Sequence, residues 1–353
     1  MEDYRLSEHG EVSCALLALK KQLIDFHFHY PLDIVPNSGT PESLSYYLYS
    51  DRLSWEALRL DDFGIAQTWF RMTGRQYFPG YIAWYGLVHL GHYLRTGRDS
   101  ELAIFLNQVD WLEKRAAVRP DGSVVWTMNF DYPMGGMIQR APWVSAHAQG
   151  FCISALVRAW RITRNRHLLE LLEGSSKIFA QDHRDRGIRV PLREGSLYTE
   201  VPGGPVPGIL DGFMTSLLGL YDLFVETGNP EVQQLFFDGI TGLKAWLPQW
   251  DYRGKWSWYG CQDYLCSPAY HCLNRVLLTV LGDLTGDQGL AQYAQKWDPD
   301  RLTVRDRVEI YLKCNWTQTA IRFRNRTWRL QASERKTGFR DITIGGAQAR
   351  SNR

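Results

Sequence analysis

Apolar residues recur at intervals of three and four along most of the chain from Pro79 onward, and this spacing predicts amphipathic helices. The apolar stripes define eight segments, which fall into four consecutive pairs. The expected helices cover residues 79–96, 100–117, 144–163, 167–181, 209–226, 230–247, 268–284 and 288–296. Helical hairpins in series predict a mainly α fold, an (α/α) toroid-like array of about four hairpins.

Residues that favour helix ends stand where these stripes begin and stop. Asn and Ser are preferred just before a helix, Pro is tolerated in its first turn, and Gly is favoured just after its last. Asn229 before Pro230 and Ser267 before Pro268 therefore mark two helix starts. Three predicted helices end at a glycine, namely Gly97, Gly228 and Gly286.

Short β-like stretches beside Gly or Pro connect the helices. We expect them at residues 122–126, 187–191, 198–201 and 255–259. Connecting segments on a rigid helical scaffold are where functional side chains concentrate. The connectors are therefore the first place to search for a site.

The chain divides into three parts by regularity and charge. Residues 1–70 lack a helical period and are turn-rich between 31 and 41, so we expect a small irregular N-terminal lobe or arm. Residues 71–300 form the helical domain. Residues 301–353 form a basic C-terminal extension, in which one more helix is expected at 304–314.

Composition indicates an ordinary globular protein with an excess of aromatic rings. Of 353 residues, 44% are hydrophobic and 22% charged, which is enough apolar material for one large core or two modest ones. Aromatic residues make up 13% of the chain. Flat amphipathic rings suit the faces of sugars, and they serve equally well in helix packing.

The net charge of +2 conceals an asymmetry, because residues 301–353 carry +9 and the first 300 residues carry −7. Such an extension suits either a polyanion or a solvated charged face, and it lacks a nucleic-acid motif. No signal peptide or membrane anchor is apparent, so we expect a cytoplasmic protein. The six cysteines lack CxxC or zinc spacing, so we expect no metal.

Two stretches carry a family resemblance. Residues 142–159 read P-W-V-S-A-H-A-Q-G, followed by I-S-A-L-V-R-A, and residues 209–222 contain I-L-D-G-F and L-G-L-Y-D. In order and spacing, these motifs resemble signatures of the D-glucuronyl C5-epimerase family. The resemblance covers roughly residues 76–284 and corresponds to the C-terminal helical domain of that family. It implies that residues 71–300 form an epimerase-like catalytic domain.

The resemblance implies a reaction without a cofactor. The family inverts carbon 5 of D-glucuronate within a heparosan-type polysaccharide and so forms L-iduronate. The proton at carbon 5 lies α to a carboxylate, so a base must remove it from one ring face while an acid returns one to the other. The negative charge that develops needs fixed donors in a partly dry site.

Three residues of this chain match catalytic positions of the family. Glu200 falls where the family has a functional glutamate and can act as a base if burial raises its pKa. Tyr259 and Tyr270 match family tyrosines, and a phenol of ordinary pKa about 10 serves naturally as an acid. The alternatives are a surface carboxylate for Glu200 and packing roles for the two tyrosines.

Further residues near these motifs are expected to line the substrate. Trp143 and Gln149 suit either sugar contact or helix packing, and His271 either orients Tyr270 or bonds to backbone. The predicted substrate-binding set is Tyr77, Trp143, Gln149, Tyr198, Asp211, Trp258 and His271.

Three departures from the family pattern bear on the substrate. Val201 stands where the family has a second tyrosine, and a valine side chain transfers no proton. Gly260, Cys261 and Gln262 replace an Asp-Leu-Arg stretch and so remove a cation, while Asp211 replaces an asparagine. These changes leave open another uronic glycan, another reaction or a lost activity.

Other functions therefore stay open beside epimerisation. A lyase would remove the same proton and then eliminate, and a glycoside hydrolase would need Asp211 or Asp263 facing Glu200 at ~5–10 Å. A non-catalytic glycan-binding relative needs only aromatic platforms. The expected partner is an anionic or uronate-containing polysaccharide rather than nucleic acid or the membrane interior. A homodimer is compatible with the sequence.

Overall fold

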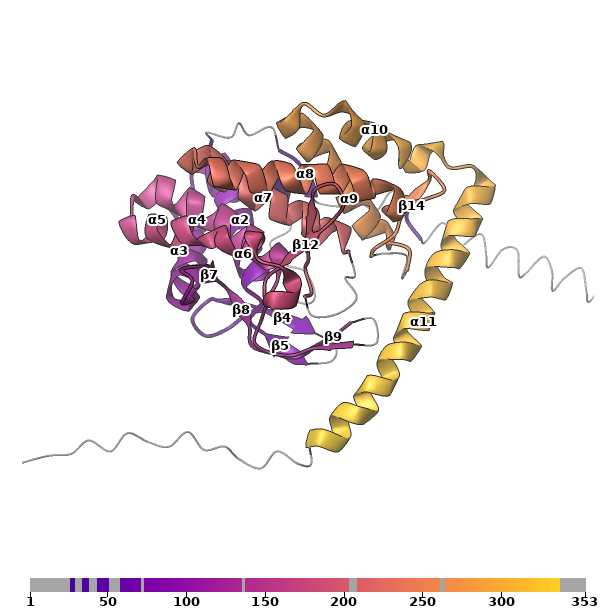
Figure 1. Cartoon of the computed structure of the whole chain (residues 1–353), viewed down its shortest axis with the longest axis horizontal. Coiled ribbons are helices and arrows are strands. Elements are labelled where there is room, and N and C mark those ends of the chain that lie inside the picture. The colour runs from indigo at the N-terminus through magenta and orange to yellow at the C-terminus, as the bar shows by residue number, and fades with distance from the viewer. Residues whose placement is uncertain are drawn as a thin grey trace, which may run out of the picture.

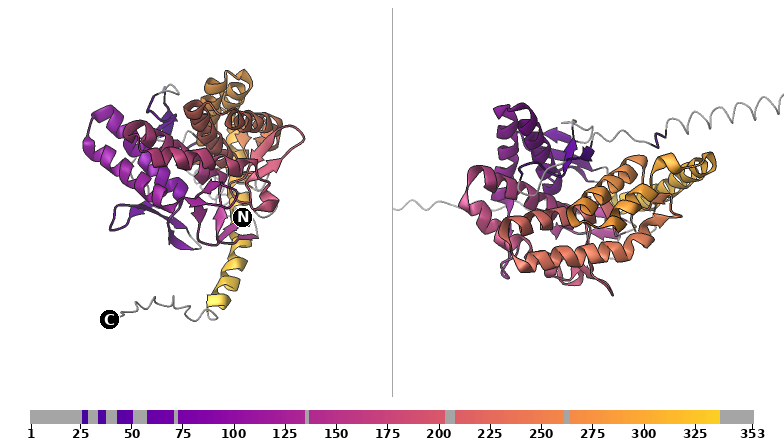
Figure 2. Two further views of the ribbon diagram at one scale, coloured as in Figure 1. Left: turned by 60° about the vertical axis from the view of Figure 1, so that its left-hand side comes forward. Right: turned by 90° about the horizontal axis from the view of Figure 1, so that it is seen from above.

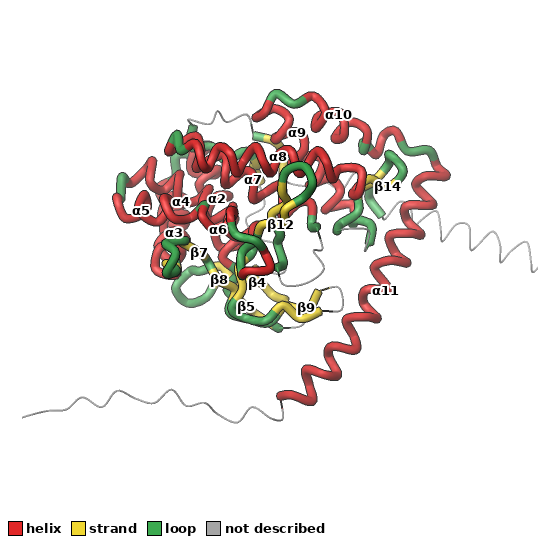
Figure 3. The backbone as a smooth tube through the Cα atoms, in the orientation of Figure 1, coloured by secondary structure: helices red, strands yellow, loops and turns green. Residues whose placement is uncertain are grey.

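The computed structural model describes residues 26–28, 34–37, 43–50, 58–70, 73–134, 137–202, 208–260 and 264–336, with side chains as far as residue 320. Most of these residues are helical, and the short strands gather mainly beside one face of the helices (Figure 1, Figure 3). The predicted mainly α class is confirmed.

The helices follow one another in pairs, as the apolar spacing predicts. The pairs are α2 (Pro79–Thr96) with α3 (Asp99–Arg115), α4 (Ala146–Thr163) with α5 (Arg166–Ser175), α7 (Leu210–Thr227) with α8 (Pro230–Trp250), and α9 (Pro268–Thr285) with α10 (Gln288–Lys296). The predicted helix at 167–181 is interrupted at Ser176, after which the short α6 (Lys177–Ala180) begins. Helix α4 begins two residues later than predicted, because Val144 pairs with Thr127 across two short strands.

Most of the predicted helix ends have the expected chemistry. Gly97, Gly228 and Gly286 adopt the left-handed conformation, with φ of 68°, 63° and 67°, and each N–H donates to the carbonyl four residues earlier. The Asn229 side chain accepts from the N–H of Glu231 at the start of α8. Before α9, the serine makes no side-chain cap, and the start of that helix relies on its proline.

Helices α2, α4, α7 and α9 pack against one another in series, and α3, α5, α8 and α10 each pack on their own partner. Seen from above, the chain runs through these helices along an arc (Figure 2). The closest approach is between α4 and α7, where a Cβ on Gly219 would lie 2.4 Å from the carbonyl oxygen of Gly150. Only glycine allows the two backbones to come so near.

The four helices that pack in series, α2, α4, α7 and α9, which we call the inner helices, run in the same direction. Tyr270 in the first turn of α9 interacts with Asp211 in the first turn of α7. Early residues touch early residues, as Gly80 of α2 meets Ala148 of α4. Late residues touch late ones, as Arg158 of α4 bonds to Asp222 of α7. The amino-terminal ends of the inner helices therefore lie at one end of the molecule, which we call the amino end, and their last turns lie at the other, the carboxyl end.

The strands are short and antiparallel. One sheet has three strands, β3 (Leu58–Leu60), β4 (Ala66–Phe70) and β5 (Gly74–Gln76). The two-stranded pairs after α3 are β6 (Ala117–Val118) with β7 (Val124–Val125), β8 (Thr127–Met128) with β11 (Trp143–Val144), β9 (Tyr132–Met134) with β10 (Met137–Gln139), β12 (Arg189–Pro191) with β13 (Ser196–Tyr198), and β14 (Asp251–Tyr252) with β15 (Trp256–Ser257). The predicted strand at 198–201 ends at Tyr198, so Glu200 follows the strand rather than lying inside it.

A strand pair from the N-terminal region covers the carboxyl end. Strand β1 (Ile34–Pro36) packs on α9, and its partner β2 (Leu48–Ser50) packs on α2, so this hairpin joins the first and last inner helices. Within residues 43–50, which we call the strap, the Tyr47 hydroxyl donates to Asp222 over 2.7 Å. Arg158 donates to the carbonyls of Leu44 and Ser45.

The last helix, α11 (Val304–Lys336), is longer than the predicted 304–314 and leaves the body along one side (Figure 1). Ile310 and Cys314 pack it onto a small core with Trp256 and Leu265. Two 3₁₀ turns, His183–Asp185 and Pro299–Arg301, complete the regular structure. No helix among the described residues is long and apolar enough to cross a membrane.

Candidate active site

Residues from several elements bring two carboxyl groups and five phenols together at the amino end. Helices α2, α7 and α9 each contribute a residue of their first turn, and the rest come from β9, from the segment after β13 and from the segment after β15. We call this set the acid–tyrosine cluster. Its members are Glu200, Asp211, Tyr81, Tyr132, Tyr259, Tyr264 and Tyr270, and electrostatic interactions link them.

Glu200 is held against the start of α7 by the segment that carries it. The Thr199 N–H donates to Ile188 and its carbonyl accepts from the N–H of Ala146, which fixes the chain on both sides. The carboxylate then lies over Gly212, where a Cβ would come within 2.0 Å of Glu200 Oε2. Glycine at this position therefore makes the space that the carboxylate occupies.

Asp211 lies in the first turn of α7, next to that glycine. The residue is 94% buried, and among the described residues its Oδ1 has no hydrogen-bond partner. Burial raises the pKa of Asp211 to about 7, although two backbone N–H groups at the helix start oppose the shift. A buried acceptor without a donor is unusual in a protein interior and marks a place where a proton or ligand is expected.

The two carboxyl groups act on one another. Burial raises the pKa of Glu200 well above its usual value, and the neighbouring charge of Asp211 raises it further. Among the described residues, neither carboxyl group forms an ion pair with a basic side chain. Holding two negative charges here is therefore unfavourable near neutral pH.

Three of the phenols are joined by ring contacts. The ring of Tyr259 stacks on the ring of Tyr264, with 4.7 Å between the ring centroids. It also forms a T-shaped contact with the ring of Tyr270, with 5.0 Å between the centroids. Burial raises the pKa of Tyr270 above its usual value, and the charges of Asp211 and Glu200 raise it further. The same causes raise the pKa of Tyr259, so both phenols remain protonated.

Tyr270 combines dense protein surroundings with access to solvent. Its side chain has 37% of its surface exposed, even though the surrounding atoms desolvate its hydroxyl. Tyr259 and Glu200 are half-buried. A substrate group can therefore reach these three predicted residues from outside, while the proton donors stay in partly dry surroundings.

An apolar wall backs the cluster on the side of α4. Phe78, Phe130, Trp143 and Val201 pack together there, with Tyr81, Tyr132 and Tyr259 against them. Val201, at the position where a tyrosine was expected from the resemblance, is a member of this wall and is 3% exposed. Tyr132 of β9 is one of the phenols that pack on this wall, and it interacts electrostatically with Glu200.

Four predicted substrate contacts lie inside the protein with their polar groups already bonded. The Gln149 amide donates to the carbonyls of Val124 and Ser175. His271 accepts from the N–H of Ser257 and donates to the carbonyl of Trp297. Trp143 donates to Phe130, and the Tyr198 hydroxyl to Leu235. These side chains hold the connectors and helix starts that carry the cluster.

Two other predicted contacts lie apart from the cluster. The Tyr77 hydroxyl donates to Asp61, and its ring stacks on Trp111 of α3. The ring of Trp258 forms a T-shaped contact with the ring of Tyr252. Cys261, Gln262 and Asp263 lie outside the described residues.

Tyr81, Tyr132 and Tyr264 were missed in the sequence. A signal existed for Tyr81, because Pro79-Gly80-Tyr81 and Pro268-Ala269-Tyr270 put a tyrosine two residues after the proline that starts an inner helix. Parallel helices bring the two tyrosines to the same end. No comparable local pattern marks Tyr132 or Tyr264.

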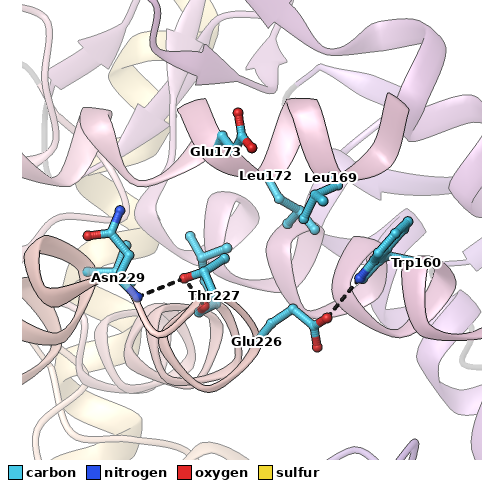
Figure 4. A pocket seen from close by; sticks show the side chains of 9 residues that line it. Trp160, Leu169, Leu172, Glu173, Glu226, Thr227 and Asn229 are labelled. Atoms are coloured by element: carbon cyan, nitrogen blue, oxygen red, sulfur yellow. Dashed lines mark hydrogen bonds between the residues drawn. The ribbon is translucent and has the colours of Figure 1, made fainter. Parts of the chain in front are cut away.

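A separate pocket of about 550 Å³ lies towards the carboxyl end, between α4, α5, α7 and α8 (Figure 4). Leu169, Leu172 and Leu223 supply much of its apolar lining. Its carboxylate Glu226 already accepts from Trp160 and Arg161. Across the described residues, no group of three or more His, Cys, Asp or Glu side chains is arranged to hold a metal ion.

Comparison with known proteins places the site region within one family. The family model described as "D-glucuronyl C5-epimerase C-terminus" matches residues 120–299, which contain every cluster member except Tyr81. An uncharacterized protein of Methanocaldococcus jannaschii is 27% identical over 187 residues, which are 49% of this chain and 57% of that protein. The D-glucuronyl C5-epimerase of Caenorhabditis elegans is 27% identical over 219 residues, which are 57% of this chain and 35% of that enzyme. The chain thus spans about half or less of the length of these relatives.

Proposed function

Because this chain belongs to the D-glucuronyl C5-epimerase family, we propose that it epimerises carbon 5 of glucuronate residues within a polysaccharide, converting D-glucuronate into L-iduronate. The observation that carries the proposal is the acid–tyrosine cluster at the amino end. It combines a carboxyl group of raised pKa with protonated phenols on separate elements. Proton removal and proton return need such a pair of unlike groups.

We assign the roles from the chemistry of the two kinds of group. Glu200, on the segment after β13, is the base that removes the proton from carbon 5. Tyr270, on α9 and partly exposed, is the acid that gives a proton to the opposite ring face. Tyr259 packs against Tyr270 and donates to the negative charge that develops on the uronate carboxylate.

The helix arrangement supports this use of the site. We take the serial packing of the helix pairs as an arc of an (α/α) toroid, with the cluster at its amino end. The basic extension of residues 301–353, at +9, suits a polyanionic chain as substrate. Heparosan is the first polymer to test, because the family resemblance implies it.

The test is proton NMR of heparosan and other glucuronate polymers incubated with the protein in heavy water. The wild type is expected to introduce deuterium at carbon 5, while Glu200→Gln and Tyr270→Phe lose about 10²–10⁴-fold of the exchange rate. Tyr77→Phe is a matched control, since this phenol bonds to Asp61 outside the cluster, and it should retain the rate.

Other outcomes identify other functions. Unsaturated product ends would indicate a lyase, and new reducing ends a hydrolase that uses Glu200 and Asp211. A folded wild-type protein that exchanges no proton in any uronic polymer would overturn the proposal in favour of a glycan-binding role.

A further inference from the structure

We infer that Glu200 and Asp211 form a single acid–base unit that holds one proton between its two carboxyl groups in the resting protein. This inference rests on the proposed function for its catalytic meaning, and it adds Asp211 to the proton-transfer machinery. Its structural basis is independent of any substrate.

Position is the first argument. Glu200 lies over the Cα of Gly212, which adjoins Asp211 in the first turn of α7. The fold itself thus brings the two acids to one helix start. The backbone N–H and carbonyl of Thr199, just before Glu200, are both hydrogen-bonded, and the Thr199 hydroxyl donates to the carbonyl of Val201, just after it. These bonds hold the segment that carries Glu200 close to the start of α7.

The missing hydrogen bond of Asp211 is the second argument. Asp211 is 94% buried, and its Oδ1 accepts from no donor among the described residues. Burying a carboxylate whose oxygen accepts no hydrogen bond destabilises the folded protein, unless the group binds a proton or a donor approaches it. A proton shared with Glu200 supplies that donor from within the protein.

The surroundings favour a shared proton over two separate charges. Among the described residues, the titratable groups that interact with the two acids are mainly phenols: Tyr81 of α2, Tyr132 of β9, Tyr270 of α9, and Tyr259 and Tyr264 after β15. The thiol of Cys266 also interacts with Asp211, and burial raises the pKa of this thiol. His147 of α4 packs on Tyr81, and burial lowers its pKa to about 4, which leaves it neutral.

Two neighbouring carboxyl groups that cannot both be ionised titrate as one coupled unit with two macroscopic pKa values. Between those values the unit carries one proton and a charge of −1. In the reaction, its bare oxygen accepts the proton from carbon 5, so the unit then holds two protons. Tyr270 meanwhile gives its proton to the other ring face and becomes a phenolate. One proton of the unit then returns to that phenolate, directly or through water, and the resting state is restored.

The first test needs no substrate. A carboxyl group whose pKa is raised on folding stabilises the folded state less as pH rises from its unfolded value, about 4, through its folded value. For Asp211 that window runs from about pH 4 to above its folded pKa of about 7. Removing either acid should therefore raise the melting temperature at pH 8 and leave it nearly unchanged at pH 4.

The measurement is thermal unfolding of wild type, Asp211→Asn, Glu200→Gln and the double variant between pH 4 and pH 8. Each single variant is expected to melt on the order of 2–5 °C above wild type at pH 8. The double variant should gain much less than the sum of the two, because one substitution already removes the repulsion. Additive gains, or single variants that run parallel to wild type at all pH values, would overturn the shared proton.

The second test reads the chemistry. If the exchange reaction occurs, the acidic limb of its pH profile reports the doubly protonated unit losing one proton to give the active form of charge −1. Sharing the remaining proton stabilises that form and lowers the pKa of this step, so Asp211→Asn should move the limb up by about a pH unit or more. An unchanged limb would contradict a role for Asp211 in the base. If no uronic polymer exchanges at all, the proposed function fails, whereas the thermal result still decides whether the proton is shared.

Discussion

Helix α7 carries two buried aspartates, and they have opposite electrostatic settings. Asp222, three turns after Asp211, accepts from Arg158 and from Tyr47, each over 2.7 Å. Asp211 lies near a second acid, and one of its carboxyl oxygens has no donor in the part of the chain that the structure describes. Two aspartates on one helix therefore differ in role: Asp222 stabilises the carboxyl end through its paired charge, whereas Asp211 stays available for proton transfer at the amino end.

The largest effect is expected at the paired end. Asp222→Asn leaves the Arg158 guanidinium buried without its charge partner and should lower the free energy of unfolding by about 3–5 kcal/mol. Urea denaturation measures this change. The matched control is Arg158→Met with Asp222→Leu, which removes both charges and should restore much of the loss. If Asp222→Asn had the same free energy of unfolding as the wild type, the ion pair would not stabilise the carboxyl end, and the contrast between the two ends would fail.

An intermediate effect is expected at the unpaired end, on activity rather than on stability. In Gly212→Ala the new methyl group occupies the position of Glu200 Oε2 and displaces the carboxylate by an ångström or more. Exchange at carbon 5 should fall by roughly 100-fold. The free energy of unfolding should change little, because alanine is a better helix former than glycine and the displaced group is a flexible side-chain end.

Exchange kinetics and urea denaturation of the same preparation separate these two quantities. Gly97→Ala is a control glycine substitution far from the cluster, and its left-handed backbone predicts a stability loss without a specific loss of exchange. If Gly212→Ala kept the wild-type rate, the position of Glu200 over α7 would not matter to the reaction.

The smallest effect is expected from Tyr47→Phe, which removes one donor from Asp222 and keeps the Arg158 bond. A hydrogen bond to a charged acceptor contributes about 1.5 kcal/mol or somewhat more, so the loss should be clearly below that of Asp222→Asn. Urea denaturation of both variants under the same conditions makes the comparison. A loss as large as that of Asp222→Asn would mean that the strap, rather than the ion pair, holds the carboxyl end.

The sequence predicted most of the paired helices well because their signals are local, whereas the last helix, α11, runs far beyond its predicted end. Apolar spacing and end residues such as Gly228 and Asn229 act within one helix, so the bounds lie within a few residues of the structure. Local signals did not predict that strand β13 ends at Tyr198 rather than at residue 201. That end depends on hydrogen bonds from Thr199 to residues of two other segments.

Glu200, Asp211, Tyr259 and Tyr270 were predicted from the family resemblance, and the structure brings these four residues together in the cluster. Tyr270 and Asp211 lie in first turns, and parallel helices gather first turns at one end. Tyr132 comes from a hairpin about 70 residues before Glu200, and only the three-dimensional packing of β9 joins them. Gln149 and His271 illustrate a different limit, because a polar side chain on an apolar face looks alike in sequence whether it meets a sugar or a backbone carbonyl.

The strap has a consequence for the order in which the protein is completed during its synthesis. Tyr47 leaves the ribosome 175 residues before its partner Asp222. At roughly 5–20 residues per second, the strap waits about 9–35 s for α7 to appear. Until then, Arg158 of α4 lacks its carboxylate partner. The carboxyl end therefore closes late, and a nascent chain stalled before residue 222 exposes the surface on which the strap will lie.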